Sequence, residues 1–172
     1  MSRYRRPSYV AWALVLAVAA ALAARFVTRE APPPEALENG ATYNVERVVD
    51  GDTLILAGGA RVRLIGVDTP EFGREGRPSE PLAEEATAFA KAFLNGRPVR
   101  VDLDRERLDR YGRFLAYIYV EEGMLNEALL RSGMARARLE FNYSDSMKRR
   151  FRKAEEVAKK ERVGIWREEN GK

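Results

Sequence analysis

The sequence predicts an α+β fold in which a small β-barrel packs against three α-helices. Apolar and polar residues alternate in five short segments between residues 42 and 120, and an amphipathic helical segment separates the third of these from the fourth. Two further helical segments follow the fifth strand. Five strands with one helix after the third and helices at the end favour a five-stranded barrel of the OB type.

The first three expected strands form a meander at residues 42–49, 54–57 and 61–67. The segment "VDGDT" supplies the turn into the second strand, and the pair of glycines at 58–59 is a hairpin signal before the third. Two more strands are expected at 99–103 and 114–120. The charged segment "DRERLDRYGR" is expected to form the loop between them.

Three helices are expected around this barrel. The first begins near Pro81, which suits a first helical turn, and stops at Asn95-Gly96. Its apolar face holds Leu82, Ala86, Phe89, Ala90 and Phe93. The second spans residues 124–132, and the third spans residues 144–162. The third is amphipathic, with a dense basic face outside and an inner face formed by Met147, Phe151, Ala154 and Ala158.

The composition narrows the chemistry available to the protein. The chain has 172 residues, with no cysteine and no histidine. A disulfide framework, a thiolate metal site and a cysteine nucleophile are therefore excluded, and the usual zinc ligands are missing. Any acid–base chemistry must use carboxylates, lysine, tyrosine or water, while an oxygen-ligated metal such as calcium or magnesium stays open.

The formal net charge of +4 does not by itself indicate a nucleic-acid binder. The first 30 residues hold five arginines against one glutamate, which accounts for all of it, so residues 31–172 balance 25 basic against 25 acidic residues. This part is polarised, because residues 131–167 hold 12 basic and 5 acidic side chains. The basic C-terminal third can meet phosphates locally, although a solvated helix face is the commoner role.

The first 30 residues are expected to form a signal peptide or a membrane anchor. Three arginines precede an apolar run over residues 9–24, and Arg25 can snorkel so that the run extends to Val27. Small residues offer cleavage sites, but Arg25 interrupts them and favours an uncleaved anchor; a buried core helix is the third interpretation. The first two export the domain, either anchored to the membrane or secreted. The remaining chain is divided into a linker at 31–41, one domain at 42–167 and a tail at 168–172.

Acidic residues cluster where two of the expected strands end. Asp50 and Asp52 flank Gly51 after the first strand, and Asp68 and Glu71 follow the third. In a meander these two points lie at the same end of the sheet, so the four carboxylates are expected to converge. Like charges in one place destabilise a protein unless a cation or arginines neutralise them, and aspartate oxygens suit calcium.

Five segments of the domain follow one another in a distinctive order. They are "VVDGDTLIL", "VRLIGVDTPE", "DRYGRFLAYIY", "LNEALLRSGMA" and "AEEVAKKERVGIW". In these segments and their order the chain resembles the staphylococcal nuclease (thermonuclease) family over residues 42–167. The resemblance implies an OB-type barrel and a calcium-dependent endonuclease that hydrolyses DNA and RNA and leaves 3′-phosphate ends.

The resemblance also implies roles for eight residues. The family's calcium ligands match Asp52, Asp68 and the backbone carbonyl of Thr69, and its proposed general base matches Glu71. Its phosphate-clamping arginines match Arg63 and Arg113, and the positions that contact a nucleotide's terminal phosphate match Arg110 and Tyr111. With these roles, the arginines stabilise charge on the phosphate while Glu71 deprotonates the attacking water.

Two segments depart from the family's pattern. "ARARLEFNY" places Leu139 and Glu140 where an aromatic residue is expected for nucleobase contact, although Phe141 and Tyr143 are close by, and residues 72–81 are less rich in lysine. Base and strand preference are therefore open. A non-catalytic nucleic-acid-binding module and a membrane-tethered interaction module are the alternative functions. The intact acids and arginines favour a nuclease, which we expect to be monomeric.

Overall fold

The computed structural model describes residues 37–73, 76–121 and 123–167. The chain divides into two units, residues 1–33 and 34–172. The expected signal peptide or anchor, most of the expected linker and the tail lie outside the described residues. Within the described ranges, no helix is long and apolar enough to cross a membrane. The interpretations of the N-terminal segment therefore stay predictions.

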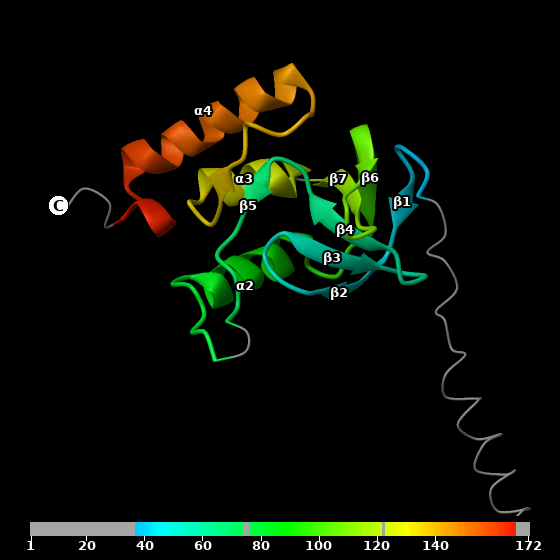
Figure 1. Cartoon of the computed structure of the whole chain (residues 1–172), viewed down its shortest axis with the longest axis horizontal. Helices are drawn as coiled ribbons and strands as arrows, with labels where there is room; N and C mark the ends of the chain where they lie inside the picture. The colour runs from blue at the N-terminus through cyan, green and yellow to red at the C-terminus, as the bar shows by residue number, and fades with distance from the viewer. Residues whose placement is uncertain (1–36, 74–75, 122, 168–172) are drawn as a thin grey trace, which may run out of the picture. The chain divides into compact units, whose positions relative to one another are not determined.

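The barrel is formed by a sheet with the strand order β1-β6-β7-β4-β3-β2, with β8 added beside β7 (Figure 1). Its strands are β1 (Thr42–Tyr43), β2 (Val45–Val48), β3 (Thr53–Leu56), β4 (Arg61–Leu64), β6 (Val99–Leu108), β7 (Phe114–Val120) and β8 (Gly123–Met124). β1 and β2 lie at opposite ends of this order, yet only Asn44 separates them in the sequence. The sheet therefore curls until its two edges approach each other, which confirms the expected OB-type fold.

Two of the expected strands are broken where the chain changes its pairing partner. The first divides into β1, which pairs with β6, and β2, which pairs with β3. The third divides into β4 and β5 (Val67–Asp68), and β5 pairs with β9 (Arg136–Ala137), a short strand that was not predicted. The second break lies at Gly66, whose φ is +72°. A Cβ atom at Gly66 would lie 2.7 Å from Phe151 and from the Tyr143 hydroxyl, so glycine is required there.

The fourth expected strand is longer than its apolar alternation indicated. β6 continues to Leu108, which pairs with Phe114 of β7 beyond a break in register. Half of the charged segment "DRERLDRYGR" is therefore strand rather than loop. Its side chains are exposed from Arg105 to Leu108, so charge here does not conflict with strand formation.

Three helices pack around the barrel: α2 (Ala83–Leu94), α3 (Leu125–Arg131) and α4 (Asp145–Glu161), followed by the 3₁₀ turn η1 (Gly164–Trp166). α3 contacts both α2 and α4 (Figure 1). α4 buries Phe151, Ala154 and Ala158, as its apolar spacing predicted. α2 begins later than expected, because Leu82 adopts a left-handed conformation with φ 71° that an α-helix does not include. Its buried face is Ala83, Ala86, Thr87, Ala90 and Leu94.

A fully buried amide fixes the chain at the break between β4 and β5. Asn126 of α3 donates a hydrogen bond to the carbonyl of Ile65 (2.9 Å) and accepts one from the backbone N–H of Ile118 (3.1 Å). These bonds satisfy backbone groups that the broken strand leaves unpaired.

Candidate active site

The turn between β2 and β3 brings Asp52 against the segment that follows β5. Asp50 closes this turn by accepting a hydrogen bond from the backbone N–H of Asp52 (3.0 Å). Gly51 permits close packing, since a Cβ atom there would lie 2.7 Å from Cγ2 of Thr69. Oδ2 of Asp52 accepts hydrogen bonds from the N–H (2.8 Å) and the hydroxyl (2.9 Å) of Thr69. The two acidic segments are therefore in direct contact, as the predicted meander required.

Asp52 is a buried carboxylate that lacks full charge compensation. Asp52 is only 5% exposed to solvent. Burial raises the pKa of Asp52 from 3.8 to about 6, against the opposing effects of the Arg63 charge and the Thr69 hydrogen bonds. An additional cation beside this carboxylate would favour its charged form.

Arg63 lies between the two predicted aspartate ligands. It comes from β4, where it pairs with Thr53, and its Nη1 lies 2.5 Å from Oδ2 of Asp52. Its Nη2 donates a hydrogen bond to Oδ1 of Asp68 (2.8 Å). Nη1 is buried, and its charge contact with Asp52 is not aligned as a hydrogen bond. One arginine thus holds both acids together, through an ion pair with Asp52 and a hydrogen-bonded ion pair with Asp68.

A second arginine, which the sequence did not single out, holds the other oxygen of Asp68. Nη1 of Arg138 donates to Oδ2 of Asp68 (2.7 Å), and its Nε donates to Glu140 (2.5 Å). The backbone explains this contact, because β9 pairs with β5 and the N–H of Arg138 bonds the carbonyl of Gly66 (3.0 Å). Asp68 is therefore shared by two guanidinium groups.

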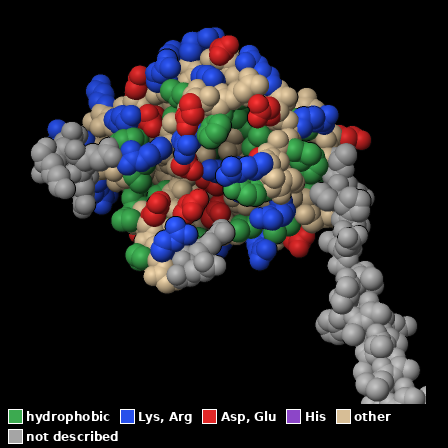
Figure 2. Space-filling model, in the orientation of Figure 1, with side chains coloured by type: hydrophobic (Ala, Val, Ile, Leu, Met, Phe, Trp, Pro, Cys, Tyr) green, Lys and Arg blue, Asp and Glu red, His purple; other side chains and the backbone are tan. Residues whose placement is uncertain are grey.

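A pocket of about 490 Å³ opens beside these residues. Its lining includes Arg63, Asp68, Arg110, Tyr111, Arg113, Arg138 and Phe141. Asp109 orients Arg113 by accepting hydrogen bonds from its Nε (2.7 Å) and its backbone N–H (3.0 Å). Arg110 bonds the hydroxyl of Tyr111 (2.7 Å), which is 64% exposed. The predicted phosphate-clamping and nucleotide-contacting residues thus share one pocket with Asp68. Figure 2 shows acidic and basic side chains close together in the middle of this face.

Glu71 is the predicted site residue that the structure leaves apart. Its backbone is held by Glu80, which accepts a hydrogen bond from the Glu71 N–H (3.1 Å) and donates its own N–H to the Glu71 carbonyl (2.9 Å). The Glu71 side chain is exposed and makes no hydrogen bond or ion pair within the described residues. Its proposed role as base therefore stays a prediction.

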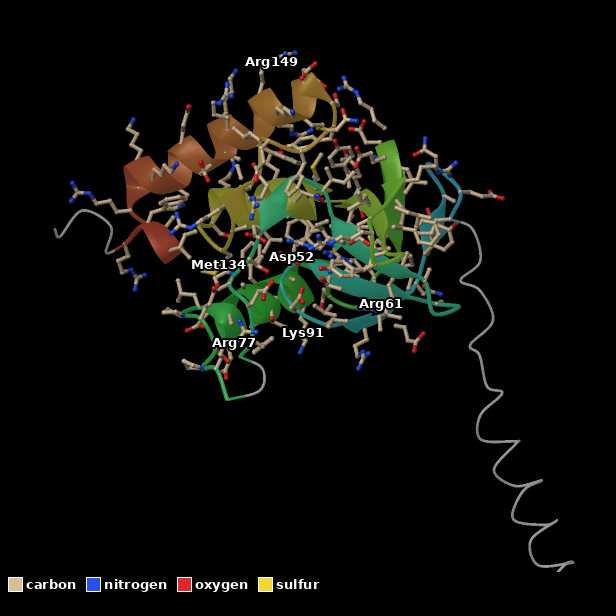
Figure 3. All side chains as sticks on the ribbon, viewed as in Figure 1. Asp52, Arg61, Arg77, Lys91, Met134 and Arg149 are labelled. Carbon is tan, nitrogen blue, oxygen red and sulfur yellow. The ribbon has the colours of Figure 1, made fainter. Side chains whose placement is uncertain are left out.

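The donor set around Asp52 fits a hard metal cation. No three acidic side chains are grouped closely enough to hold a metal by themselves in the part of the chain that the structure describes, so the expected convergence of four carboxylates was wrong. Asp52 and Asp68 nevertheless approach the same cationic group, Arg63, and both offer only oxygen atoms. Two such carboxylates, with the adjacent Thr69 carbonyl and water, are ligands of the kind that calcium takes. Figure 3 places Asp52 in the interior of the molecule, close to β3.

Comparison with known proteins identifies the family of the chain. A family model described as "Staphylococcal nuclease homologue" matches residues 61–168. The chain belongs to the staphylococcal nuclease family. It is similar to the thermonuclease of Staphylococcus hyicus, with 36% identity over 159 residues that cover 89% of this chain and 94% of that protein. It is also similar to the thermonuclease of Staphylococcus intermedius, with 40% identity over 130 residues that cover 74% and 77%.

A third relative is longer than this chain and matches it over less than half of its own length. The SPbeta prophage-derived endonuclease YokF of Bacillus subtilis is 34% identical over 126 residues, which cover 71% of this chain and 43% of that protein. The segment that matches the staphylococcal nuclease family model contains seven of the predicted site residues but not Asp52. Asp52 joins the others through its contacts with Arg63 and Thr69.

Near the position where the family pattern places an aromatic residue, Phe141 is the aromatic side chain exposed at the pocket. Phe141 is 53% exposed and lines the pocket, whereas Tyr143 is only 1% exposed. Leu139 packs against the hydrophobic core. Of the two aromatic residues that the sequence offered near the departure, only Phe141 presents a large exposed ring.

Three residues that position this site were missed by sequence reasoning: Arg138, Asp109 and Asn126. Asp109 stands in "DRYGR", four residues before Arg113, so its role was open to inference from the turn. Arg138 acts on an aspartate 70 positions away, and Asn126 on a carbonyl 61 positions away. No local pattern in the staphylococcal nuclease segments indicates either contact.

Proposed function

We propose that this member of the staphylococcal nuclease family is a calcium-dependent endonuclease that hydrolyses DNA and RNA and leaves 3′-phosphate ends. The observation that carries the proposal is the position of Arg63, which pairs with both Asp52 and Asp68 and lines a pocket that Arg113 also lines. Positively charged groups at such a site stabilise a phosphodiester during hydrolysis. Its phosphate carries negative oxygens and gains further charge as water attacks phosphorus.

Asp52, Asp68 and the carbonyl of Thr69 would hold the calcium ion. Bound there, calcium would act as a Lewis acid on a phosphate oxygen. The raised pKa of Asp52 supports this assignment, because a carboxylate that burial destabilises gains most from a neighbouring cation. With the acids bound to a cation, Arg63 would be released to the substrate.

The arginines would bind the remaining phosphate oxygens. Arg63 would offer the donors that now face Asp52 and Asp68, and Arg113 would offer the donors that Asp109 does not engage. A guanidinium binds phosphate oxygens through two parallel hydrogen bonds, which fixes the orientation of the group. Arg110 and Tyr111, exposed at the rim of the same pocket, would contact the neighbouring phosphate of the substrate.

Glu71 would accept the proton of the attacking water. The oxygen of that water forms a bond to phosphorus while the bond from phosphorus to the 5′ oxygen breaks. The 3′ side keeps the phosphate, and the departing 5′ oxygen takes a proton from solvent. Glu71 suits this role because its side chain is exposed to solvent and makes no hydrogen bond or ion pair within the described residues.

The N-terminal segment would place this activity outside the cytoplasm. The arginines before the apolar run favour a cytoplasmic N-terminus, so the domain would be exported, anchored or released after cleavage. Fractionation of cells that express the tagged full chain, with protease added from outside, tests this part. A domain protected from protease in intact spheroplasts would contradict export.

The catalytic proposal is tested by cleavage of labelled single- and double-stranded DNA and RNA by the full chain. We expect cleavage in calcium, none in a chelator, and 3′-phosphate ends in the products. A folded protein that binds these nucleic acids and leaves them intact in calcium would instead support the non-catalytic binding module. The oligomeric state, expected to be monomeric, is measured on the same samples by sedimentation.

A further inference from the structure

One side of α4 faces β9 and carries basic residues at helical spacing. Lys148, Arg152, Glu155 and Lys159 follow one another at intervals of three or four residues, so they share one side of the helix. Glu155 fixes this side against β9, because it accepts a hydrogen bond from the backbone N–H of Ala137 (2.8 Å). Lys159 is engaged by Glu155 (2.8 Å), which leaves Lys148 and Arg152 as the cations of this side nearer the start of α4.

Lys148 and Arg152 adjoin the wall of the pocket. The ammonium of Lys148 lies 5.2 Å from the centre of the Tyr143 ring, and Tyr143 lines the pocket. Burial raises the pKa of the Tyr143 hydroxyl, while the nearby positive charge of Arg152 opposes this effect. Both basic side chains are therefore close to one pocket residue.

A third basic side chain, that of Arg138, extends this group of cations into the pocket. It lines the pocket and bonds Glu140 (2.5 Å). A backbone hydrogen bond, with the positive charges of Arg138 and Lys148, holds the pKa of Glu140 below its usual range. The positive charges of Arg138 and Lys148 therefore both act on the Glu140 carboxylate. Arg138, Lys148 and Arg152 together form what we call the basic ledge.

The basic ledge has donors available for an anion. The side chains of Lys148 and Arg152 have no hydrogen bond or ion pair with another described residue. Arg138 has five N–H donors, and the bonds to Asp68 and Glu140 engage two of them. Figure 2 shows Lys and Arg side chains gathered over α4, so the ledge belongs to a positively charged region.

We propose that the basic ledge is a phosphate track that binds the single-stranded part of a nucleic-acid substrate beyond the pocket. This inference rests on the proposed nuclease function and defines its substrate as an extended strand rather than a mononucleotide ester. The cations of the basic ledge form a single row, and a single row of cations suits one sugar-phosphate backbone. Phe141, whose ring lies 5.2 Å from the Arg138 guanidinium, offers an exposed aromatic face for a base at the start of the track.

The test compares two double variants of α4 that remove the same charge. Lys148→Gln with Arg152→Gln alters the ledge, whereas Arg149→Gln with Lys153→Gln alters cations on the outer side of the helix. Figure 3 shows Arg149 at the outer side of α4, away from Asp52. Arg149 and Lys153 are exposed and have no described partner, so both pairs should fold alike, which thermal unfolding verifies.

Two quantities are measured on the full chain at several salt concentrations. The first is the affinity for a fluorescent DNA strand of about 12 nucleotides in a chelator, by anisotropy. The second is kcat/KM with calcium for that strand and for a dinucleotide. For the ledge variant we expect the slope of log affinity against log salt to fall by about 1.4, since each lost phosphate contact on a single strand contributes about 0.7.

The ledge variant should also lower kcat/KM for the long strand roughly tenfold, as expected for two exposed ion pairs, and by a smaller factor for the dinucleotide. The outer variant should retain the original slope and rates. Equal losses in the two variants would overturn the proposal, because they would reflect bulk charge. Loss of binding to vesicles of anionic lipid, with unchanged DNA affinity, would overturn it in favour of a membrane surface.

Failure of the nuclease proposal is distinguishable from failure of the track. If no variant cleaves, anisotropy still reports whether the ledge binds the strand. If all variants cleave the long strand with the same kcat/KM and the same salt dependence, the nuclease proposal stands and the track is wrong.

Discussion

The guanidinium of Arg63 lies 2.5 Å from the buried carboxylate of Asp52. The same side chain bonds Asp68 at 2.8 Å, so one arginine compensates two acids that come from different turns. The acids are the proposed metal ligands, and the arginine is the proposed phosphate ligand. With these proposed roles, metal binding and substrate binding would be coupled in this site, since a cation on the acids would release the guanidinium to the phosphate.

We expect Arg63→Gln to destabilise the protein in a chelator. Removing one partner of a mostly buried pair leaves the Asp52 carboxylate uncompensated, so the free energy of unfolding should fall by about 3 kcal/mol. Urea denaturation measures this change. Asp52→Asn in the Arg63→Gln background should restore part of the loss, and a double-mutant cycle with no coupling would contradict the assignment.

Glu71→Gln should separate catalysis from folding. If Glu71 accepts the proton of water, kcat should fall by about 10²–10⁴. The free energy of unfolding should change by less than about 0.5 kcal/mol, because the side chain is exposed and without described contacts. Steady-state cleavage and urea denaturation give the two values. Glu84→Gln, an exposed change on α2, is the matched control, and equal rates for both variants would remove Glu71 from the mechanism.

Asp109 is expected to act through Arg113. It holds both the side chain and the backbone of Arg113, so Asp109→Asn should loosen the guanidinium and lower kcat by about tenfold, less than the 10²–10³ expected for losing the arginine donors in Arg113→Lys. In the Arg113→Lys background, Asp109→Asn should have little further effect. Full additivity of the two losses in kcat would show that Asp109 acts independently.

The sequence predicted the parts of this site that depend on strand order. The contact of Asp52 with Thr69 follows from a meander, because the exits of its first and third strands lie at the same end. The breaks at Asn44 and Gly66 were not predictable from alternation, since they arise where barrel closure and α4 packing redirect the chain. The Arg138 contact depends on β9, a strand of two residues, which is too short to give a periodic signal.

The stability of the α4 start should depend on pH through Asp104. Asp104 accepts hydrogen bonds from the Tyr117 hydroxyl and from the backbone N–H of Ser144 (2.9 Å), the residue just before α4. Burial acts to raise its pKa, but the bonds from Tyr117 and Ser144 outweigh burial and hold the pKa of Asp104 below its model-compound value of 3.8.

A group whose pKa is lower in the folded state stabilises the protein above its unfolded pKa, and this contribution is lost as pH falls through the folded value. Asp104→Asn should therefore lower the free energy of unfolding by about 1.5–3 kcal/mol at neutral pH, the usual contribution of a hydrogen bond to a charged group. The difference between the two proteins should shrink as pH falls below about 4, near the unfolded aspartate pKa. Urea denaturation from pH 3 to 7 measures it, with Asp145→Asn, an exposed residue of the same helix start, as the control. A difference that stays constant over this range would show that the Asp104 charge does not contribute.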